Sequence, residues 1–404
     1  DECIGSNDLD TFTTLAGNDV IYGFGGNDQI IAGPGNDTIY GGPGNDNIQP
    51  GAGDDIIYGE EGNDTIYLSS GVDIEDGGPG IDTIIFGPDQ TPLPVTINLD
   101  TGRYHFTSQI AAVSQNLFSI ENVTSEGSAD LTIFDTIGVN EITTNSGNDI
   151  IHSKGGNDII NTAAGNDTVY LGTGQYTVDL GSGNDVIYLT TSASIIEGNT
   201  GTDEAIVRAF DGFVDVYIDL KFSTYFVPSK LTAQDGMDVS LKSFEKVTID
   251  GNVSATINGS AAADIIVGDD GADTITGRGG ADTLTGGNRS DKFIYSPDDT
   301  GITEATADTI TDFSTGADKI DIQTPGTYVE VDGTANNFAA FLTNAGNSFT
   351  GNADDIYVEY NLNGSGNTYV LVDEDKSGTV NAGDTLIILS GLSTADGLDS
   401  SDII

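Results

Sequence analysis

The sequence contains very little cysteine, methionine, histidine or basic residue, and it has no tryptophan. One Cys, one Met and two His occur among 404 residues, and 12 Lys and Arg stand against 64 Asp and Glu, so the formal net charge is −52. With Cys3 as the single thiol, an internal disulfide is excluded, and an intermolecular one is the only disulfide option. Such an acidic surface repels phosphate groups and anionic lipids, so we expect no nucleic-acid partner and no membrane insertion.

Long apolar runs, an N-terminal Met and common enzyme motifs are also missing. No run approaches the roughly 18 apolar residues that span a bilayer. The N-terminus lacks a basic segment followed by an apolar one, so we expect a signal peptide to be absent or already removed. The motifs His-Glu-x-x-His and Gly-x-Ser-x-Gly do not occur, and the two histidines, His105 and His152, lie far apart in the sequence. The sequence therefore predicts no zinc site and no catalytic acid–base pair, and we do not expect an enzyme.

A strongly acidic composition with few aromatic residues is typical of disorder, but the aspartates here are regularly spaced. In the first part of the chain Asp recurs every nine residues, with a Gly two residues before nearly every copy and a large apolar residue two residues after it. The aspartates are Asp10, Asp19, Asp28, Asp37, Asp46, Asp55, Asp64, Asp73 and Asp82. The apolar residues are Phe12, Ile21, Ile30, Ile39, Ile48, Ile57, Ile66 and Ile84, with Glu75 as the one break.

A period of nine fits a short strand followed by a tight turn. Gly accepts the positive φ of the turn, and the middle one of the three extended residues points inward. Two copies make one coil of 18 residues, so each Asp stacks on the Asp of the next coil. Stacked carboxylates repel each other unless a cation lies between them, and Ca²⁺ prefers carboxylate and carbonyl oxygens.

The same phase returns in two further blocks. The second block carries Asp149, Asp158, Asp167, Tyr176 and Asp185, with Asp203 in register behind it, and its inward residues are Ile151, Ile160, Val169, Val178 and Ile187. The third block carries Asp264, Asp273, Asp282 and Asp291, with inward Ile266, Ile275, Leu284 and Phe293. Because Tyr176 replaces an Asp, the carboxylate ladder is broken on that side of the second block.

These nonapeptides resemble those of the RTX (repeats-in-toxin, haemolysin-type calcium-binding) family, built on Gly-Gly-x-Gly-x-Asp-x-large-x; residues 41–48 read Gly-Gly-Pro-Gly-Asn-Asp-Asn-Ile. The resemblance implies an all-β fold, a parallel β-roll or calcium-binding β-solenoid, in which Asp carboxylates and turn carbonyls of successive loops hold Ca²⁺. The implied ligands are Asp19, Asp28, Asp37, Asp46, Asp55, Asp64, Asp73, Asp82, Asp149, Asp158, Asp167, Asp185, Asp203, Asp264, Asp273, Asp282 and Asp291. Asp10 is a weaker case, because its turn has lost the preceding Gly. Counting the gaps between stacked loops predicts roughly a dozen Ca²⁺.

The C-terminal stretch carries two other patterns. Residues 308–321 resemble the unit that follows the last repeat in serralysin-type and other RTX proteins exported by type I secretion. Residues 373–384 read as an EF-hand-type loop, whose candidate ligands are Asp373, Asp375, Ser377, Asn381 and Asp384. Its flanks, 369–372 and 386–389, read as strands, which favours a local calcium clip inside a β domain over a helix-opening sensor. The alternative is a solvated acidic turn.

The patterns divide the chain into six segments. We predict RTX β-roll blocks at 1–90, 140–205 and 258–295, β-strand spacers at 91–139 and 206–257, and a C-terminal β-sandwich-like domain at 296–404. The two spacers resemble each other, since 95–99 parallels 216–220 and 118–123 parallels 244–247. Their alternating strands around a variable loop indicate caps or lateral packing units.

Outward residues that are 18 apart line up on one sheet. In the first block one sheet carries Val20, Tyr22, Thr38, Tyr40, Ile56, Tyr58, Ile74 and Asp76, whereas the opposite sheet is more polar, and the second block repeats this asymmetry. We expect an apolar stripe of this kind to be buried against another surface. That surface is either another part of the chain or another copy of the chain in a surface array.

Three functions remain open. The first is an extracellular structural protein of the cell surface, an S-layer or matrix component that folds and assembles on Ca²⁺ binding after type I secretion. Its expected partners are further copies of the chain and cell-surface polysaccharide, for which tyrosines would replace the missing Trp. The second is the RTX carrier or secretion portion of an exoenzyme, toxin or adhesin, and the third is a polysaccharide-active enzyme with an unrecognised acidic site.

Overall fold

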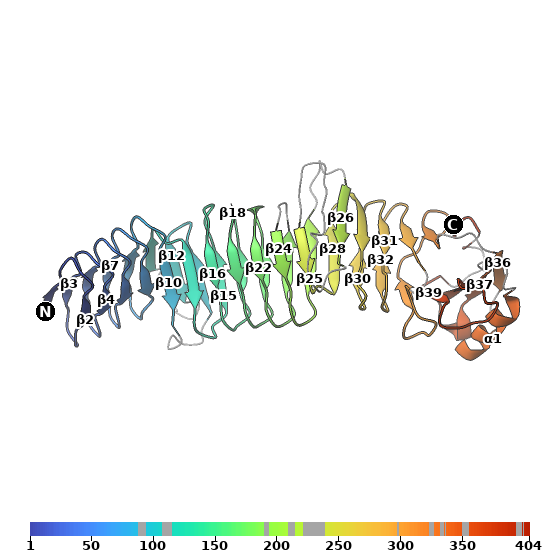
Figure 1. The fold of residues 1–404 in the computed structure, drawn as a ribbon, viewed down its shortest axis with the longest axis horizontal. Helices are drawn as coiled ribbons and strands as arrows, with labels where there is room; N and C mark the ends of the chain where they lie inside the picture. The colour runs from blue at the N-terminus through green and yellow to red at the C-terminus, as the bar shows by residue number, and fades with distance from the viewer. Residues whose placement is uncertain are drawn as a thin grey trace. The chain divides into compact units, whose positions relative to one another are not determined.

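The structure, a computed structural model, describes residues 1–87, 94–106, 115–189, 194–208, 215–220, 239–296, 299–322, 327–331, 335, 337–349, 355–392, 398 and 400–404. The chain forms two compact units, residues 1–201 and residues 202–404 (Figure 1). Among the described residues, no helix is long and apolar enough to cross a membrane.

The first unit begins as a parallel β-solenoid, as the nine-residue period predicts. Each repeat forms one short strand, and each strand pairs in parallel with the strand one coil later, so that Ile21 lies opposite Ile39 and Ile30 opposite Ile48. One sheet contains β1 (Glu2–Ile4), β3 (Val20–Tyr22), β5 (Thr38–Tyr40), β7 (Ile56–Tyr58) and β9 (Ile74–Asp76). The facing sheet contains β2 (Thr11–Thr13), β4 (Gln29–Ile31), β6 (Asn47–Gln49), β8 (Thr65–Tyr67) and β10 (Thr83–Phe86).

The core of the solenoid is a column of middle-strand side chains. Ile21, Ile30, Ile39, Ile48, Ile57, Ile66 and Ile84 are all 0% exposed. Full burial of one such side chain contributes about 1.5–3 kcal/mol, and the stacking repeats this contribution in every strand. The solenoid is therefore held by its inward column, as expected, and Glu75 takes the corresponding place on β9, also fully buried.

The first spacer is part of the solenoid. Its strands are β11 (Val95–Asn98), β12 (Arg103–Phe106), β13 (Gln115–Phe118), β14 (Asn122–Ser125) and β15 (Leu131–Phe134). In one sheet β13 pairs with β9, β12 pairs antiparallel with β13 and β11, and β11 pairs with β15, so the chain order is reversed inside the sheet. In the facing sheet β14 continues directly from β10. The expectation of a cap or lateral unit is thus wrong for these strands, because they complete coils of the roll.

The second block continues the same stacking in the first unit. Its strands are β16 (Glu141–Thr143), β17 (Ile150–His152), β19 (Ile159–Asn161), β20 (Thr168–Tyr170), β22 (Thr177–Asp179), β23 (Val186–Leu189) and β24 (Ser194–Glu197), with short strands β18 (Gly155–Gly156) and β21 (Thr173–Gly174) in the turns. β17, β20 and β23 form one sheet, and β19, β22 and β24 form the other.

The second unit also begins as a solenoid. One sheet contains β25 (Glu204–Arg208), β28 (Lys246–Asp250), β30 (Ile265–Val267), β32 (Thr283–Thr285) and β34 (Asp308–Ile310). The other contains β26 (Asp215–Asp219), β29 (Ser254–Asn258), β31 (Thr274–Thr276), β33 (Lys292–Ile294) and β35 (Lys319–Asp321), and β27 (Val239–Lys242) precedes β28. The second spacer therefore also supplies coils, whereas the variable loops expected in both spacers fall outside the described residues.

The C-terminal end departs from the expected sandwich in one respect. β39 (Thr385–Leu389) pairs with β34 and β38 (Thr368–Asp373), and β38 pairs with β37 (Asp355–Tyr360), which is joined by β36 (Thr327–Val331). Helix α1 (Phe338–Ser348) covers one face of this sheet through Phe341 and Ala345, and the 3-10 turn η1 (Leu362–Gly364) adds Leu362 to the same core. A helix, and not a second sheet, closes this face.

Candidate metal sites

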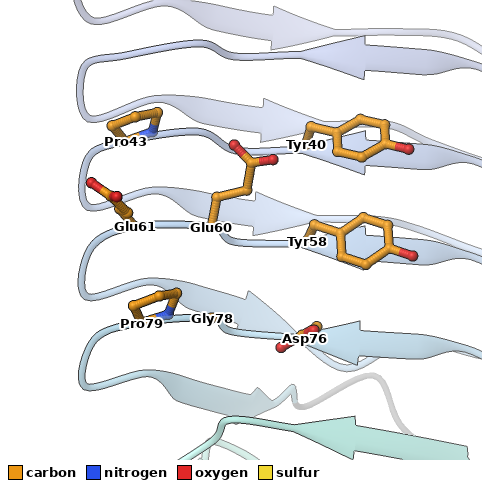
Figure 2. A pocket seen from close by; sticks show the side chains of 8 residues that line it. All are labelled: Tyr40, Pro43, Tyr58, Glu60, Glu61, Asp76, Gly78 and Pro79. Atoms are coloured by element: carbon orange, nitrogen blue, oxygen red, sulfur yellow. The ribbon is translucent and has the colours of Figure 1, made fainter.

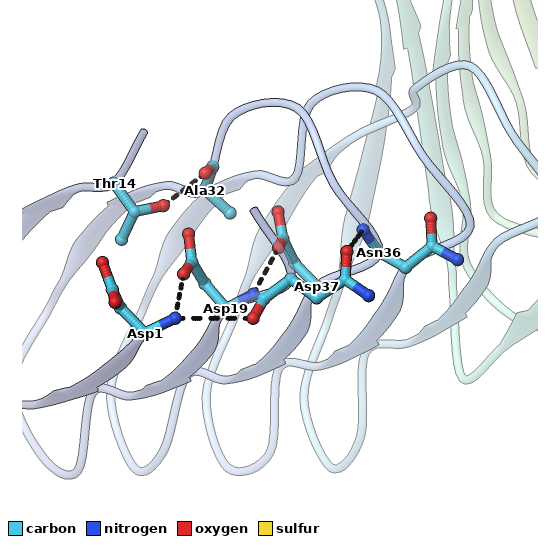
Figure 3. A network of polar contacts seen from close by, with 7 residues as sticks. Asp1, Thr14, Asp19, Ala32, Asn36 and Asp37 are labelled. Atoms are coloured by element: carbon cyan, nitrogen blue, oxygen red, sulfur yellow. Dashed lines mark hydrogen bonds and ion pairs between the residues drawn. The ribbon is translucent and has the colours of Figure 1, made fainter. Parts of the chain in front are cut away.

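The predicted aspartates form continuous ladders along the edges of the roll. In each ladder, a backbone N–H donates to Oδ1 of the Asp one coil later: the N–H of Asp28 to Asp46 at 2.8 Å, and that of Asp64 to Asp82 at 2.7 Å. Figure 3 shows the same contact from Asp19 to Asp37, which measures 2.8 Å. One carboxylate oxygen of each Asp therefore holds two coils together directly.

Asparagines next to the ladder form a second set of contacts that the repeat analysis missed. The N–H of Asn36 donates to Oδ1 of Asn18 at 2.9 Å, and the N–H of Asn45 donates to Oδ1 of Asn27 at 3.0 Å. The direction is opposite to that of the Asp ladder, since here the later coil donates. The recurring Gly-Asn-Asp triplet is the signal in the sequence that marks these contacts.

The other carboxylate oxygen is buried and lacks a hydrogen-bond donor. Among the described residues this holds for Oδ2 of Asp28, Asp37, Asp46, Asp55, Asp64, Asp82, Asp273, Asp282 and Asp291. Burial is the main cause that raises the pKa of Asp64 to about 7 and the pKa of Asp46 to about 6, while the backbone N–H of the preceding coil opposes the rise. A buried carboxylate needs a partner, so these orphan oxygens fit a cation with a preference for oxygen ligands.

The later predicted residues occupy the same ladders. Asp149 contacts Asp167, Asp167 contacts Asp185, Asp264 contacts Asp282, and Asp273 contacts Asp291, at 2.7–2.9 Å. Asp158 accepts from the N–H of Asn140 at 2.9 Å. Tyr176 breaks the ladder as expected: its N–H donates to Ser194, and its hydroxyl contacts Ser153.

Four ladder residues were not predicted because they break the interval. Oε2 of Glu121 accepts from the N–H of Asp82 at 2.8 Å, and Oε2 of Glu245 accepts from the N–H of Asp203 at 2.9 Å. Both glutamates lie in the segments where the two spacers resemble each other. In the second unit Asp308 and Asp318 accept from Asp282 and Asp291, which lie 26 and 27 residues earlier.

The EF-hand-type loop gathers three carboxylates. Oxygens of Asp373, Asp375 and Asp384 lie within 4.8 Å of one another. Backbone N–H groups of Ser377 and Gly378 donate to Asp373, and the Asn381 amide donates to Asp375 at 3.0 Å. The flanks are strands β38 and β39, as predicted. Burial raises the pKa of Asp384 to about 6, so the loop brings together oxygen ligands that repel one another without a cation.

Two comparisons with family models bear on this geometry. The model of the RTX calcium-binding nonapeptide repeat matches residues 4–39, 22–57, 40–75, 49–84, 138–178 and 179–206. The chain belongs to the RTX family. A second model, that of the serralysin C-terminal domain of peptidase family M10, matches residues 219–404 of this RTX protein. No match was found among curated proteins.

The family and the geometry agree on calcium binding. The repeats are calcium-binding repeats, and the serralysin-type C-terminus is that of a protein exported by type I secretion. The orphan oxygens of the first block lie in the repeats that the RTX model matches, and those of Asp273, Asp282 and Asp291 lie in the stretch that the serralysin model matches. The RTX chain is therefore a calcium-binding, secreted β-roll protein.

Proposed function

We propose that this RTX protein is an extracellular structural component of the cell surface, of the S-layer or matrix type, that folds and assembles when it binds Ca²⁺ after secretion. The observation that supports assembly is a pair of aromatic ladders on the outer face of one sheet of the first unit. Tyr22, Tyr40 and Tyr58 stack with ring centroids 5.0 and 5.2 Å apart. These half-buried rings form a continuous, partly apolar stripe.

The second ladder runs from the last strand of the first spacer into the second block. Phe134, His152, Tyr170 and Tyr188 stack at 4.5, 4.6 and 4.5 Å with nearly parallel rings. His152 lies between two aromatic rings, where burial lowers its pKa. The facing sheet carries Asn161 and Asp179 at the matching outward positions. The aromatic side is thus the side suited to a second copy of the chain.

Calcium would supply the positive charge that the ladders lack. The Asp carboxylates of the roll and the carbonyls of its turns would hold the ion, and Asp373, Asp375 and Asp384 would hold one in the C-terminal loop. The protein's own residues prepare these sites, because the Oδ1 contacts fix each carboxylate against the next coil. A ligand that binds only the folded form stabilises it by about 2.7 kcal/mol per site at a hundred times its Kd, so several sites together make folding depend on calcium.

Cell-surface polysaccharide is the proposed second partner. A pocket of about 450 Å³ opens where the first aromatic ladder ends (Figure 2). Its lining residues are Tyr40, Pro43, Tyr58, Glu60, Glu61, Asp76, Gly78 and Pro79. Aromatic rings beside carboxylates offer an apolar surface and acceptors for sugar hydroxyls.

A second candidate function is the secretion portion of a larger exoenzyme, toxin or adhesin. The observation in its favour is the match of residues 219–404 to the C-terminal domain of a peptidase family. A gene product with a further folded domain before residue 1 would support this function over the first.

Assembly is tested by imaging the purified chain with and without Ca²⁺ by negative-stain electron microscopy. We expect ordered sheets or filaments with Ca²⁺ from the wild type and from a control, Gln29→Glu with Asn47→Glu on the facing sheet. We expect none from Tyr40→Glu with Tyr58→Glu, although circular dichroism shows that this variant still folds with Ca²⁺. Equal assembly of all three proteins would contradict the proposed contact surface, and no assembly of the wild type would contradict the structural function.

A further inference from the structure

The first residue of each turn, five positions before the ladder Asp, divides the loops into two groups. We call it the loop-start residue. Glycine loops begin at Gly5, Gly23, Gly41, Gly59, Gly77, Gly198, Gly259, Gly268, Gly277 and Gly286. Side-chain loops begin at Thr14, Ala32, Pro50, Leu68, Thr144, Ser153, Thr162, Leu171 and Leu180. The nine-residue period does not separate the groups, because both keep the ladder position.

Backbone conformation does not account for the loop-start glycines. Gly62, two residues before Asp64, has a φ of +142°, and a Cβ added there would lie 1.6 Å from the carbonyl oxygen of Gly44. The coil itself therefore requires glycine at that position. The loop-start Gly59 lies outside the left-handed region, so its backbone would accept any residue, and another reason must explain its lack of a side chain.

The reason lies in two oxygen atoms that converge on the loop-start glycine. A Cβ on Gly59 would lie 2.3 Å from Oδ2 of Asp64 and 2.5 Å from the carbonyl oxygen of Gly77 in the next coil. The corresponding pairs of distances are 2.5 and 2.2 Å at Gly23, 2.5 and 2.8 Å at Gly41, 2.5 and 2.5 Å at Gly77, 2.8 and 2.4 Å at Gly259, and 2.3 and 2.7 Å at Gly268. Real Cβ atoms do not approach so closely, so any side chain would push these oxygens apart.

The converging oxygens are the type of ligand that Ca²⁺ takes. One is the Oδ2 of a buried carboxylate, which lacks a donor except in Asp264, where the N–H of Ser260 donates to it, and the other is a backbone carbonyl. Both are hard oxygen donors of the kind that calcium prefers. The same arrangement recurs through the first block and at Gly259 and Gly268 in the third, whereas the nearest oxygens at Gly277 and Gly286 are those of carboxylates. The loop-start glycine thus keeps a carboxylate and a carbonyl of successive coils directed toward each other.

In the threonine loops a hydroxyl takes this place. The hydroxyl of Thr144 donates to the carbonyl oxygen of Thr162 at 3.1 Å, and that of Thr162 donates to Leu180 at 2.8 Å. Thr14 donates to the carbonyl of Ala32 in the same way (Figure 3). This carbonyl is the one that points at the carboxylate in a glycine loop. The hydroxyl therefore already joins the two coils there.

We propose that the glycine loops of the ladders bind calcium and that the threonine loops bind none. The inference rests on the proposed calcium binding of the roll and narrows it. The calcium carboxylates are then Asp10, Asp28, Asp46, Asp64, Asp82, Asp203, Asp264, Asp273, Asp282 and Asp291. The threonine loops of the second block stack through their hydroxyls and the Oδ1 contacts, so these loops keep their coils together without calcium.

The number of bound ions, counted by native mass spectrometry on the full chain at saturating Ca²⁺, tests this restriction. Gly59→Ser adds a Cβ and a hydroxyl to a glycine loop, and we expect it to bind one ion fewer than the wild type. Thr162→Gly removes the hydroxyl from a threonine loop, and we expect one ion more. Thr162→Ser keeps the hydroxyl and serves as the control with an unchanged count. Unchanged counts for both Gly59→Ser and Thr162→Gly would overturn the inference.

A second measurement does not depend on the folding of any variant. Anomalous difference density from a wild-type crystal grown with Ca²⁺ should show ions beside Asp46 and Asp64 and none beside Asp149 or Asp167. Ions in both groups of loops would overturn the restriction and leave calcium binding by the roll intact. A complete absence of bound calcium in wild type, by either method, would instead contradict the proposed function itself.

Discussion

The inward column predicts a specific cost for shortening one of its side chains. Ile48 on β6 is fully buried between Ile30 on β4 and Ile66 on β8. The neighbouring coils are fixed on both sides by the Asp ladders, so they can move little into the space that Ile48→Ala would leave. Buried Ile→Ala changes cost about 2–5 kcal/mol, and we expect about 3 kcal/mol here.

The assay should report local opening, because a chain with two units need not unfold in one step. Hydrogen exchange at saturating Ca²⁺ gives the opening free energy of the amides in each strand. We expect Ile48→Ala to lower it mainly in β4, β6 and β8, since a coil contacts only its neighbours. Ile31→Ala, on the outer face of β4 and 41% exposed, is the matched control and should cost about 0.5 kcal/mol or less. Equal losses for the two variants would refute the inward column as the core of the roll.

Three further predictions concern charges. Burial raises the pKa of Asp64 to about 7 from 3.8, so the calcium-free fold holds a proton that the unfolded chain has released. Its stability in chelator should therefore fall as the pH rises from about 4 to about 7, and thermal melts that show no such decrease would contradict the burial of uncompensated carboxyls. Asp375→Asn and Asp384→Asn each remove one charged ligand, and each should weaken Ca²⁺ binding at the C-terminal loop on the order of tenfold. Calorimetry measures this affinity, and an unchanged affinity would exclude the loop as a calcium site. Glu121→Ala should leave the N–H of Asp82 without its acceptor, which lowers the stability by about 1–3 kcal/mol and speeds the hydrogen exchange of this amide. Glu121→Gln keeps an acceptor and should restore the protection. Equal exchange rates in the two variants would contradict the ladder contact.

The regular part of the fold could be predicted from the sequence because one period determines three properties at once. Spacing of 18 between equivalent residues sets the strand register, the inward column and the outer stripes, and Ile39 pairs between Ile21 and Ile57 accordingly. The spacers escaped prediction because their pairing is not local: β13 reaches the sheet before β12 and β11. Helix α1 was missed although it has a conventional start, in which Asn337 accepts from the N–H of Ala340 at 2.9 Å.

The candidate sites could be located from the sequence, but their oxygen atoms could not be assigned. The ladder positions follow from the period, whereas the commitment of Oδ1 to the preceding coil depends on the distance between stacked turns. Asp308 and Asp318 take ladder positions at intervals of 26 and 27 residues, because the turns before them are longer. The difference between a glycine loop and a threonine loop was visible in the sequence, but its meaning required the positions of Oδ2 and the facing carbonyl.

The reversed strand order of the first spacer has a consequence for how the chain folds. Along the regular roll each new coil closes contacts that are 18 residues apart, and closure at the spacer joins Asp82 to Glu121 across 39 residues. The longer closure costs only about 0.7 kcal/mol of additional chain entropy, so the spacer lowers the free energy of unfolding very little. Kinetically it interrupts propagation, because β13, β12 and β11 stack in the reverse of their chain order. The spacer thus separates two regions of low contact order that can nucleate independently, and a defect on one side need not spread to the other.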